Sequence, residues 1–254
     1  MGCAAPDRAR PGHVELMVRP VVLAGHLLLA GCGGGSEPAP AARATAAQPP
    51  EHRVVHFRAA DGRRLHGRLT PATRSHAPAV VLVHGLYGEP SQWDAFVGHL
   101  HRAGFTTLAY ASRSDHQPDE GVLARDLTGA VRALRARPEA DPDRIVLAGA
   151  SVGGSTVAYA LGTQPGLPVR GGVAFSALEG PREIALARRR AFRPHDLLLI
   201  TDQREAGNAR ALRADAHGAG TSIHVAETTG HGVDLASDPS AREQAIAWLE
   251  RLTA

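Results

Sequence analysis

Short apolar runs alternate with amphipathic stretches from residue 51 to the C-terminus. The runs at 53–59 and 64–70 flank Asp61-Gly62, a strong turn signal, and predict an antiparallel hairpin. The later runs are almost entirely apolar, which is typical of parallel strands that are buried on both faces. They predict strands at 79–85, 105–112, 144–150, 170–178, 196–202 and 221–228, with helices at 91–103, 119–137, 151–161, 181–190, 206–219 and 241–252. This alternation predicts an α/β fold with one mostly parallel, eight-stranded sheet and helices on both faces.

A different pattern precedes this domain. Arg19 is followed by an apolar run at 21–30 and then by small residues, which is the order of zones in an export signal. The run of about ten residues is too short to span a membrane, which takes about 20. Its ending, Leu29-Ala30-Gly31-Cys32, resembles the lipobox of bacterial lipoprotein signal peptides and implies cleavage before Cys32 and lipid attachment to it. A buried core helix followed by a Gly-rich turn is the alternative, and Met17 is an alternative start.

The chain therefore divides into a signal peptide at 1–31, a tether at 32–50 and one globular domain at 51–254. The tether is rich in Gly, Ala and Pro and is expected to be a semi-flexible spacer. Cys3 leaves with the signal peptide and Cys32 is acylated, so neither a disulfide nor a cysteine metal site is expected. The expected location is the bacterial cell envelope, outside the cytoplasm and anchored to a membrane through Cys32.

Composition narrows the range of partners. With 43% hydrophobic and 21% charged residues, the chain has the composition of an ordinary globular protein. Its net charge of +3 is small, and the densest basic run, at 188–190, is expected to be a solvated helix face. Nucleic acid is therefore not an expected partner.

Gly149, Ser151 and Gly153 form a G-x-S-x-G pattern directly after the apolar run at 144–150. In such a strand-turn-helix the serine lies at the apex of a strained turn, and its neighbours must lack side chains. The pattern makes Ser151 a candidate nucleophile. An ordinary turn serine among glycines is the alternative.

The strand order, with this turn after the fifth strand, resembles the α/β-hydrolase fold over 51–254. In that fold the acid usually follows the seventh strand and the histidine follows the eighth. The resemblance implies that Asp202 and His231 complete a catalytic triad with Ser151. Glu179, after the sixth strand, is the alternative acid, because the acid can also follow that strand. If Glu179 is the acid, Asp202 is expected to be only a helix cap.

The resemblance also implies an oxyanion hole. Two backbone N–H groups usually stabilise the negative oxygen, one after the nucleophile and one in the loop after the third strand. These belong to Val152 and Leu86. His84-Gly85 matches the HG dipeptide of the family, and His84 is expected to support this loop.

These features predict a lipid-anchored serine hydrolase, most consistent with a carboxylesterase that acts on short or exposed acyl esters through an acyl-enzyme. The sequence around Ser151 resembles the dienelactone-hydrolase-like branch, although serine replaces the usual cysteine. A short interval at 177–195 predicts that no cap domain is present. No metal or organic cofactor is implied, and the expected partners are a small ester and the membrane. A peptidase or thioesterase of the same fold and a non-catalytic binding lipoprotein are the alternatives.

Overall fold

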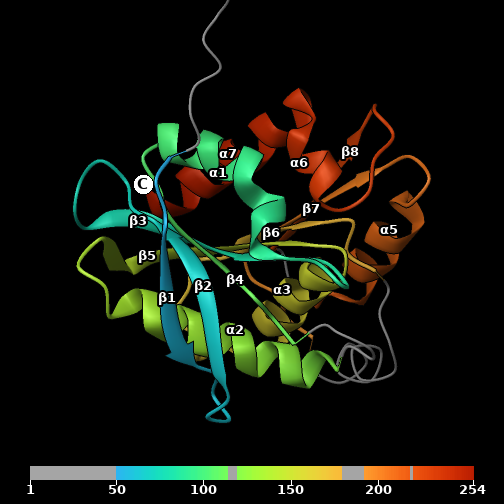
Figure 1. Cartoon of the computed structure of the whole chain (residues 1–254). Coiled ribbons are helices and arrows are strands. Elements are labelled where there is room, and N and C mark those ends of the chain that lie inside the picture. The colour runs from blue at the N-terminus through green and yellow to red at the C-terminus, as the bar shows by residue number, and fades with distance from the viewer. Residues whose placement is uncertain (1–49, 114–118, 179–191, 218–219) are drawn as a thin grey trace, which may run out of the picture. The chain divides into compact units, whose positions relative to one another are not determined.

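Within the described part of the chain, eight strands form one sheet in the order β1-β2-β4-β3-β5-β6-β7-β8 (Figure 1). β2 pairs antiparallel with β1 and β4, and the other neighbouring pairs are parallel. The strands are β1 (Arg53–Arg58), β2 (Arg64–Thr70), β3 (Ala77–Val83), β4 (Thr106–Tyr110), β5 (Ala140–Ala150), β6 (Gly172–Phe175), β7 (Leu197–Asp202) and β8 (Thr221–Ala226). The prediction of an eight-stranded, mostly parallel sheet is confirmed.

The computed structural model describes residues 50–113, 119–178, 192–217 and 220–254. The expected signal peptide, Cys32, Glu179 and the expected helix at 181–190 lie outside these ranges. Most of the interval whose shortness predicts the lack of a cap also lies outside them. No helix within the described ranges is long and apolar enough to cross a membrane.

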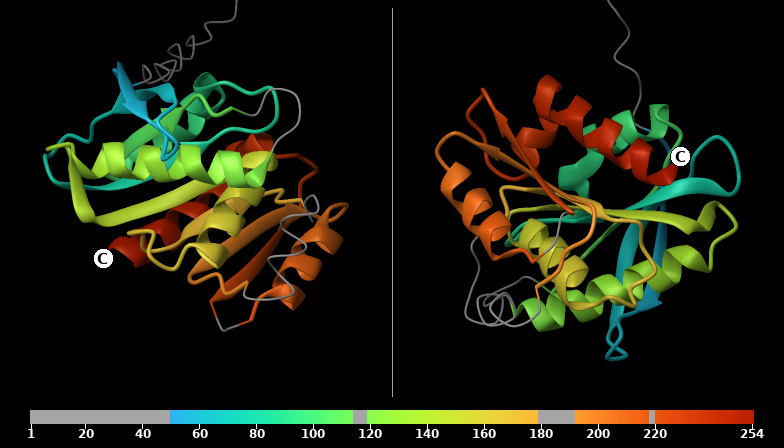
Figure 2. Two further views of the ribbon diagram at one scale, coloured as in Figure 1. Left: turned by 90° about the horizontal axis from the view of Figure 1, so that it is seen from below. Right: turned by 180° about the vertical axis from the view of Figure 1, so that it is seen from behind.

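Helices cover both faces of the sheet (Figure 2). One face carries α2 (Glu120–Arg135), α3 (Val152–Thr163) and α5 (Ala206–Asp215). The other carries α1 (Asp94–Arg102), which follows a 3-10 turn η1 (Pro90–Trp93), together with α6 (Val233–Ser237) and α7 (Pro239–Thr253). Successive strand residues point to opposite faces, as a strand requires. Leu147 therefore packs under α2 and α3, while its neighbour Val146 packs under α1 and α7.

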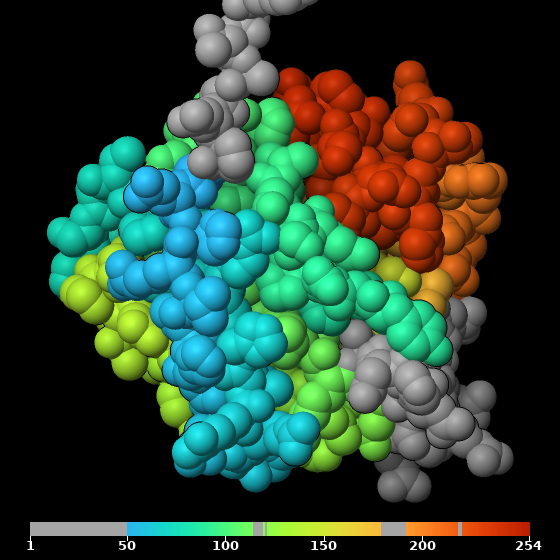
Figure 3. Space-filling model, in the orientation of Figure 1, coloured from blue at the N-terminus to red at the C-terminus, as the bar shows by residue number. Residues whose placement is uncertain are grey.

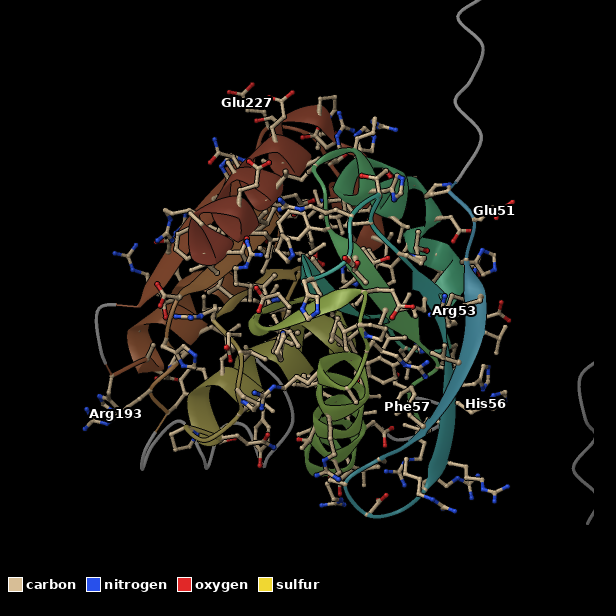
Figure 4. The ribbon with its side chains drawn as sticks, turned by 90° about the vertical axis from the view of Figure 1, so that its left-hand side faces the viewer. Glu51, Arg53, His56, Phe57, Arg193 and Glu227 are labelled. Carbon is tan, nitrogen blue, oxygen red and sulfur yellow. The ribbon has the colours of Figure 1, made fainter. Side chains whose placement is uncertain are left out.

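The same alternation orients β1, which forms one edge of the sheet. In Figure 4, His56 and Phe57 point to opposite sides of the strand. Phe57 packs edge-on against Tyr110 of β4, with ring centroids 5.9 Å apart, whereas His56 is exposed. The hairpin turn contains Gly62 at φ +87°, a conformation that favours glycine.

Several elements differ from the sequence prediction, and β6 (Gly172–Phe175) is shorter at both ends than the strand predicted at 170–178. β5 begins at Ala140 rather than near residue 144, because Ala140 pairs with Ala77 of β3; the register then shifts, and Ala79 pairs with Ile145. α6 was not predicted, since five residues are too few to show a helical period. The carboxyl ends of β5 to β8 lie at one edge of the sheet, where Asp202 ends β7 and the segments that carry Ser151 and His231 follow β5 and β8.

Candidate active site

Ser151 lies at the sharp turn between β5 and α3. Its backbone has φ +54° and ψ −119°, a rare conformation for a residue with a side chain. A Cβ atom on Gly149 would lie 2.2 Å from the carbonyl oxygen of Gly153, and one on Gly153 would lie 2.2 Å from that of Val83. The turn therefore requires glycine at both positions. Strain of this kind is concentrated at functional sites.

His231 lies beside this serine, in the loop after β8. Its Nε2 is 2.9 Å from Oγ of Ser151. Its Nδ1 is 2.8 Å from Oε1 of Glu205, which directly precedes α5. A carboxylate at Nδ1 places the proton on that nitrogen and leaves Nε2 free to accept the hydroxyl proton of serine. The structure therefore contains a serine-histidine-carboxylate chain.

Asp202 lies at the end of the seventh strand as predicted, but among the described contacts it does not reach His231. It is the last residue of β7, where it pairs with Ala226, and its carboxylate is fully buried. Oδ1 accepts the N–H of Glu205 at 2.9 Å, and Oδ2 accepts from Nε of Arg204 at 2.8 Å and from the N–H of Gly230 at 3.4 Å. The carboxylate that faces His231 is that of Glu205. The bond from the N–H of Glu205 to Asp202 is instead the one that the alternative role of Asp202, a helix cap, requires.

The electrostatics of Asp202 agree with these contacts. Burial alone raises the pKa of its carboxyl group, but the Arg204 guanidinium and the two backbone N–H groups outweigh burial and hold this pKa below its usual range. Asp202 is therefore a buried, charged group whose acceptor sites are used by Arg204, Glu205 and Gly230. Sequence reasoning missed Glu205. The available signal was that it is the first acidic residue between β7 and the next helix.

The predicted oxyanion-hole residues flank the nucleophile. Val152 is the first residue of α3, and the N–H groups of a first helical turn lack helical partners. A Cβ atom on Gly85 would lie 3.4 Å from Cβ of Ser151, so the loop after β3 packs closely against the turn. Leu86 follows in that loop and is 39% exposed. Both backbone segments are close enough to the serine to be considered for this role.

His84 connects this loop to the next one. Its ring is 2% exposed, and its Nε2 accepts the N–H of Ser112, after β4, at 3.0 Å. The proton therefore lies on Nδ1, which donates to the carbonyl oxygen of Gly85 at 2.8 Å. Burial lowers the pKa of His84, although the Gly85 carbonyl and the Glu89 carboxylate act in the opposite direction. His84 thus supports the loop as a neutral imidazole.

This depressed pKa predicts a pH-dependent stability. The unfolded chain takes up the His84 proton near a pKa of about 6.5, and the folded protein takes it up only at lower pH. The unfolded state then binds more protons, so His84 costs stability as the pH falls below about 6.5. We expect His84→Gln to lose less stability than the wild type between pH 7.5 and 5.5. Urea unfolding midpoints at both pH values test this, with His56→Gln as the exposed control. Equal losses in wild type and His84→Gln would contradict it.

A cavity of about 560 Å³ opens at the serine. Its walls come from the loop after β3, the nucleophile turn and the segment after His231, and on the face shown in Figure 3 the first and last of these lie side by side. The lining includes Leu86, Tyr87, Gln92, Ser151, His231 and Asp234. Across the described ranges, no group of His, Cys, Asp and Glu side chains is arranged to hold a metal ion.

Comparisons with known proteins agree with the fold. A model of the alpha/beta hydrolase family matches residues 80–253. A dienelactone hydrolase from Anabaena variabilis superposes with a TM-score of 0.66 and 18% identity, over 82% of this chain and 100% of that chain. An esterase from Pyrococcus furiosus superposes with a TM-score of 0.64 and 16% identity, over 80% of this chain and 91% of that chain. At these identities the similarity concerns the fold.

Similarity to curated sequences is more limited. The uncharacterized protein YfhR of Salmonella typhi is 30% identical over 122 residues, which are 45% of this chain and 42% of the relative. YfhR of Escherichia coli K12 is 29% identical over 116 residues, which are 42% of this chain and 41% of that relative. The match thus spans about two fifths of the length of these curated relatives.

Proposed function

Since the chain belongs to the alpha/beta hydrolase family, we propose that it is a serine hydrolase with Ser151 as nucleophile, His231 as general base and Glu205 as the acid. Membership of this family supports hydrolase activity, and the fold predicted from the sequence is confirmed. The observation that carries the proposal is the continuous chain of contacts from Oγ of Ser151 through His231 to Glu205, at 2.9 and 2.8 Å. A serine hydroxyl needs such a base, because it is a weak nucleophile near neutral pH.

The proposed reaction has two halves. In the first, Ser151 Oγ attacks the ester carbonyl carbon while its proton moves to Nε2 of His231, and the backbone N–H groups of Val152 and Leu86 hold the resulting oxyanion. His231 then returns the proton to the departing alcohol, which leaves an acyl group on Ser151. In the second half, water attacks the acyl carbon while His231 takes the water proton; His231 then returns the proton to Oγ of Ser151 as the bond to Oγ breaks and the carboxylic acid leaves. Glu205 stabilises the imidazolium that forms in each half.

We assign the acid to Glu205 because only this carboxylate contacts His231 among the described residues. Its side chain is 27% exposed, and its Oε2 is buried without a hydrogen-bond partner in the described part of the chain. Glu205 is therefore held in a partly desolvated position, with one oxygen directed at the imidazole. Asp202 has no such contact.

For the substrate we propose carboxylic esters with short or exposed acyl groups. Three lining residues are well exposed: Leu86 at 39%, Tyr87 at 67% and the His231 side chain at 47%. A site with such walls buries little of a long acyl chain. The names of the structural neighbours, an esterase and a dienelactone hydrolase, are consistent with ester or lactone substrates.

A series of p-nitrophenyl esters from two to sixteen carbons tests both the activity and this preference. We expect kcat/KM to be highest for acetyl or butyryl esters. A buried methylene stabilises binding by about 0.8 kcal/mol, and acyl groups that stay in water lack this gain. Ser151→Ala serves as the control for background hydrolysis. A steady rise in kcat/KM with chain length would overturn the preference, and no hydrolysis of any ester would overturn the esterase proposal.

A further inference from the structure

The loop that carries His231 is fastened on both sides of the histidine by side chains that take no part in the proton path. On one side, the N–H of Gly232 donates to Oγ of Ser176 at 3.0 Å. On the other, the N–H of Gly230 donates to Oδ2 of Asp202 at 3.4 Å. These acceptors come from the ends of β6 and β7, so the sheet itself determines where the loop lies.

Ser176 has an unusual backbone. It directly follows β6, is 1% exposed and has φ +47°, a left-handed conformation that residues with a side chain rarely adopt. Its own N–H donates to the carbonyl oxygen of Ile200 in β7 at 2.8 Å, so the strained residue is fixed to the sheet. Strain at a buried residue persists only where the surrounding structure imposes it, and it concentrates at functional sites. Here the strained residue is also the one whose hydroxyl accepts the N–H of Gly232 in the histidine loop.

The other end of this bond lies against the nucleophile. Gly232 is buried and has φ +60°. A Cβ atom on Gly232 would lie 3.6 Å from Cβ of Ala150 and 3.7 Å from Cβ of Ser151. The bond from Ser176 therefore holds the residue next to His231 in contact with the turn that carries the serine. It fixes the base relative to the nucleophile.

We propose that Ser176 is a positioning residue for His231, and that it acts with Asp202 to hold the histidine loop at two points. The inference rests on the proposed function, because it assigns Ser176 a role through the general base. Proton transfer depends closely on the 2.9 Å separation of Oγ and Nε2. A displacement of about 1 Å can cost about 100-fold in rate. Ser176 is not among the residues that line the cavity, so its loss is expected to lower kcat and to leave KM nearly unchanged.

The test compares Ser176→Ala with Thr106→Val. Thr106 also has a buried hydroxyl that accepts a backbone N–H, that of Ala72, at 3.0 Å. It is the first residue of β4 and therefore lies at the amino ends of the parallel strands, away from the site at their carboxyl ends. We expect Ser176→Ala to lower kcat on p-nitrophenyl acetate about tenfold with KM within twofold of wild type. Thr106→Val should keep kcat even if its unfolding midpoint falls. Ser176→Cys should be intermediate, because a thiol is a weak acceptor.

Two outcomes overturn the proposal: an unchanged kcat in Ser176→Ala, or an equal fall of kcat in Thr106→Val. Should Ser176→Ala fail to fold, Ser176→Gly replaces it, since glycine relieves the left-handed strain and also lacks the hydroxyl. The same tenfold fall is then expected, and a wild-type kcat is a refutation. Fluorophosphonate labelling separates this test from that of the proposed function. A wild type labelled at Ser151 with an unaffected Ser176→Ala refutes only the positioning role, whereas a wild type that is not labelled at Ser151 refutes the serine mechanism itself.

Discussion

Ser151→Ala and His231→Ala are each expected to lower kcat for ester hydrolysis by about 10⁴-fold or more. In the proposed mechanism the hydroxyl forms the covalent bond to the acyl group and the imidazole, 2.9 Å away, accepts its proton, so removal of either disables the other. The effects of such substitutions on kcat are not additive, so the double variant should lose little more activity than either single variant. Initial rates on p-nitrophenyl acetate measure turnover, and labelling by a fluorophosphonate probe measures the reactivity of Ser151.

Matched controls come from exposed residues of the same types. Ser237→Ala and His217→Ala remove a serine and a histidine outside the contact chain, and both should retain wild-type rates. Circular dichroism and thermal unfolding should show that all four variants fold. Turnover by Ser151→Ala within tenfold of wild type would rule out this serine as the nucleophile.

Glu205→Gln is expected to reduce kcat by about 10³-fold. The neutral amide cannot stabilise the imidazolium, and its N–H₂ group, if turned to Nδ1, favours the tautomer with the proton on Nε2. Glu205→Asp keeps the charge on a shorter side chain and should lose less. Asp202→Asn should cost only about tenfold, because Asp202 supports the backbone of Glu205 and of the histidine loop without contacting the imidazole. Single-turnover rates of acylation compare the three.

The ranking of the two acids decides the assignment. A larger loss in Asp202→Asn than in Glu205→Gln would restore the acid predicted from the sequence. Glu227→Gln, an exposed acid after β8, is the control for a general change in charge near the site, and it should be neutral.

The sequence predicted the sheet well because its strands are runs of apolar residues that only a doubly covered sheet buries. Ser151 and His231 were predicted because each follows a strand whose place in the order is clear. Glu205 was missed for a local reason. The strand was predicted to end at Asp202, and the resemblance made this residue the acid, but the apolar pattern at 196–202 does not show that the Asp202 carboxylate is bound by the N–H groups of Glu205 and Gly230. The acid that reaches the histidine is the next one along the chain.

Other features leave no trace in the sequence pattern. A left-handed serine such as Ser176 looks like any serine at the end of a strand, because its conformation depends on neighbours from β7 and the loop after β8. The five residues of α6 are likewise set by packing, with Leu235 and Ala236 buried against the sheet. Local propensity is a weak guide where tertiary contacts decide the backbone.

The cavity is lined by Ser151 and His231 of the reaction centre and also by residues outside the proton path. Ser151 follows β5, Glu205 follows β7 and His231 follows β8, whereas Gln92 in η1 and Asp234 in α6 line the cavity outside the proton path. Among the described contacts, the side chains of Gln92 and Asp234 form no bond within the proton path. The cavity wall can thus be altered at Gln92 and Asp234 while every contact of the proposed proton path is kept.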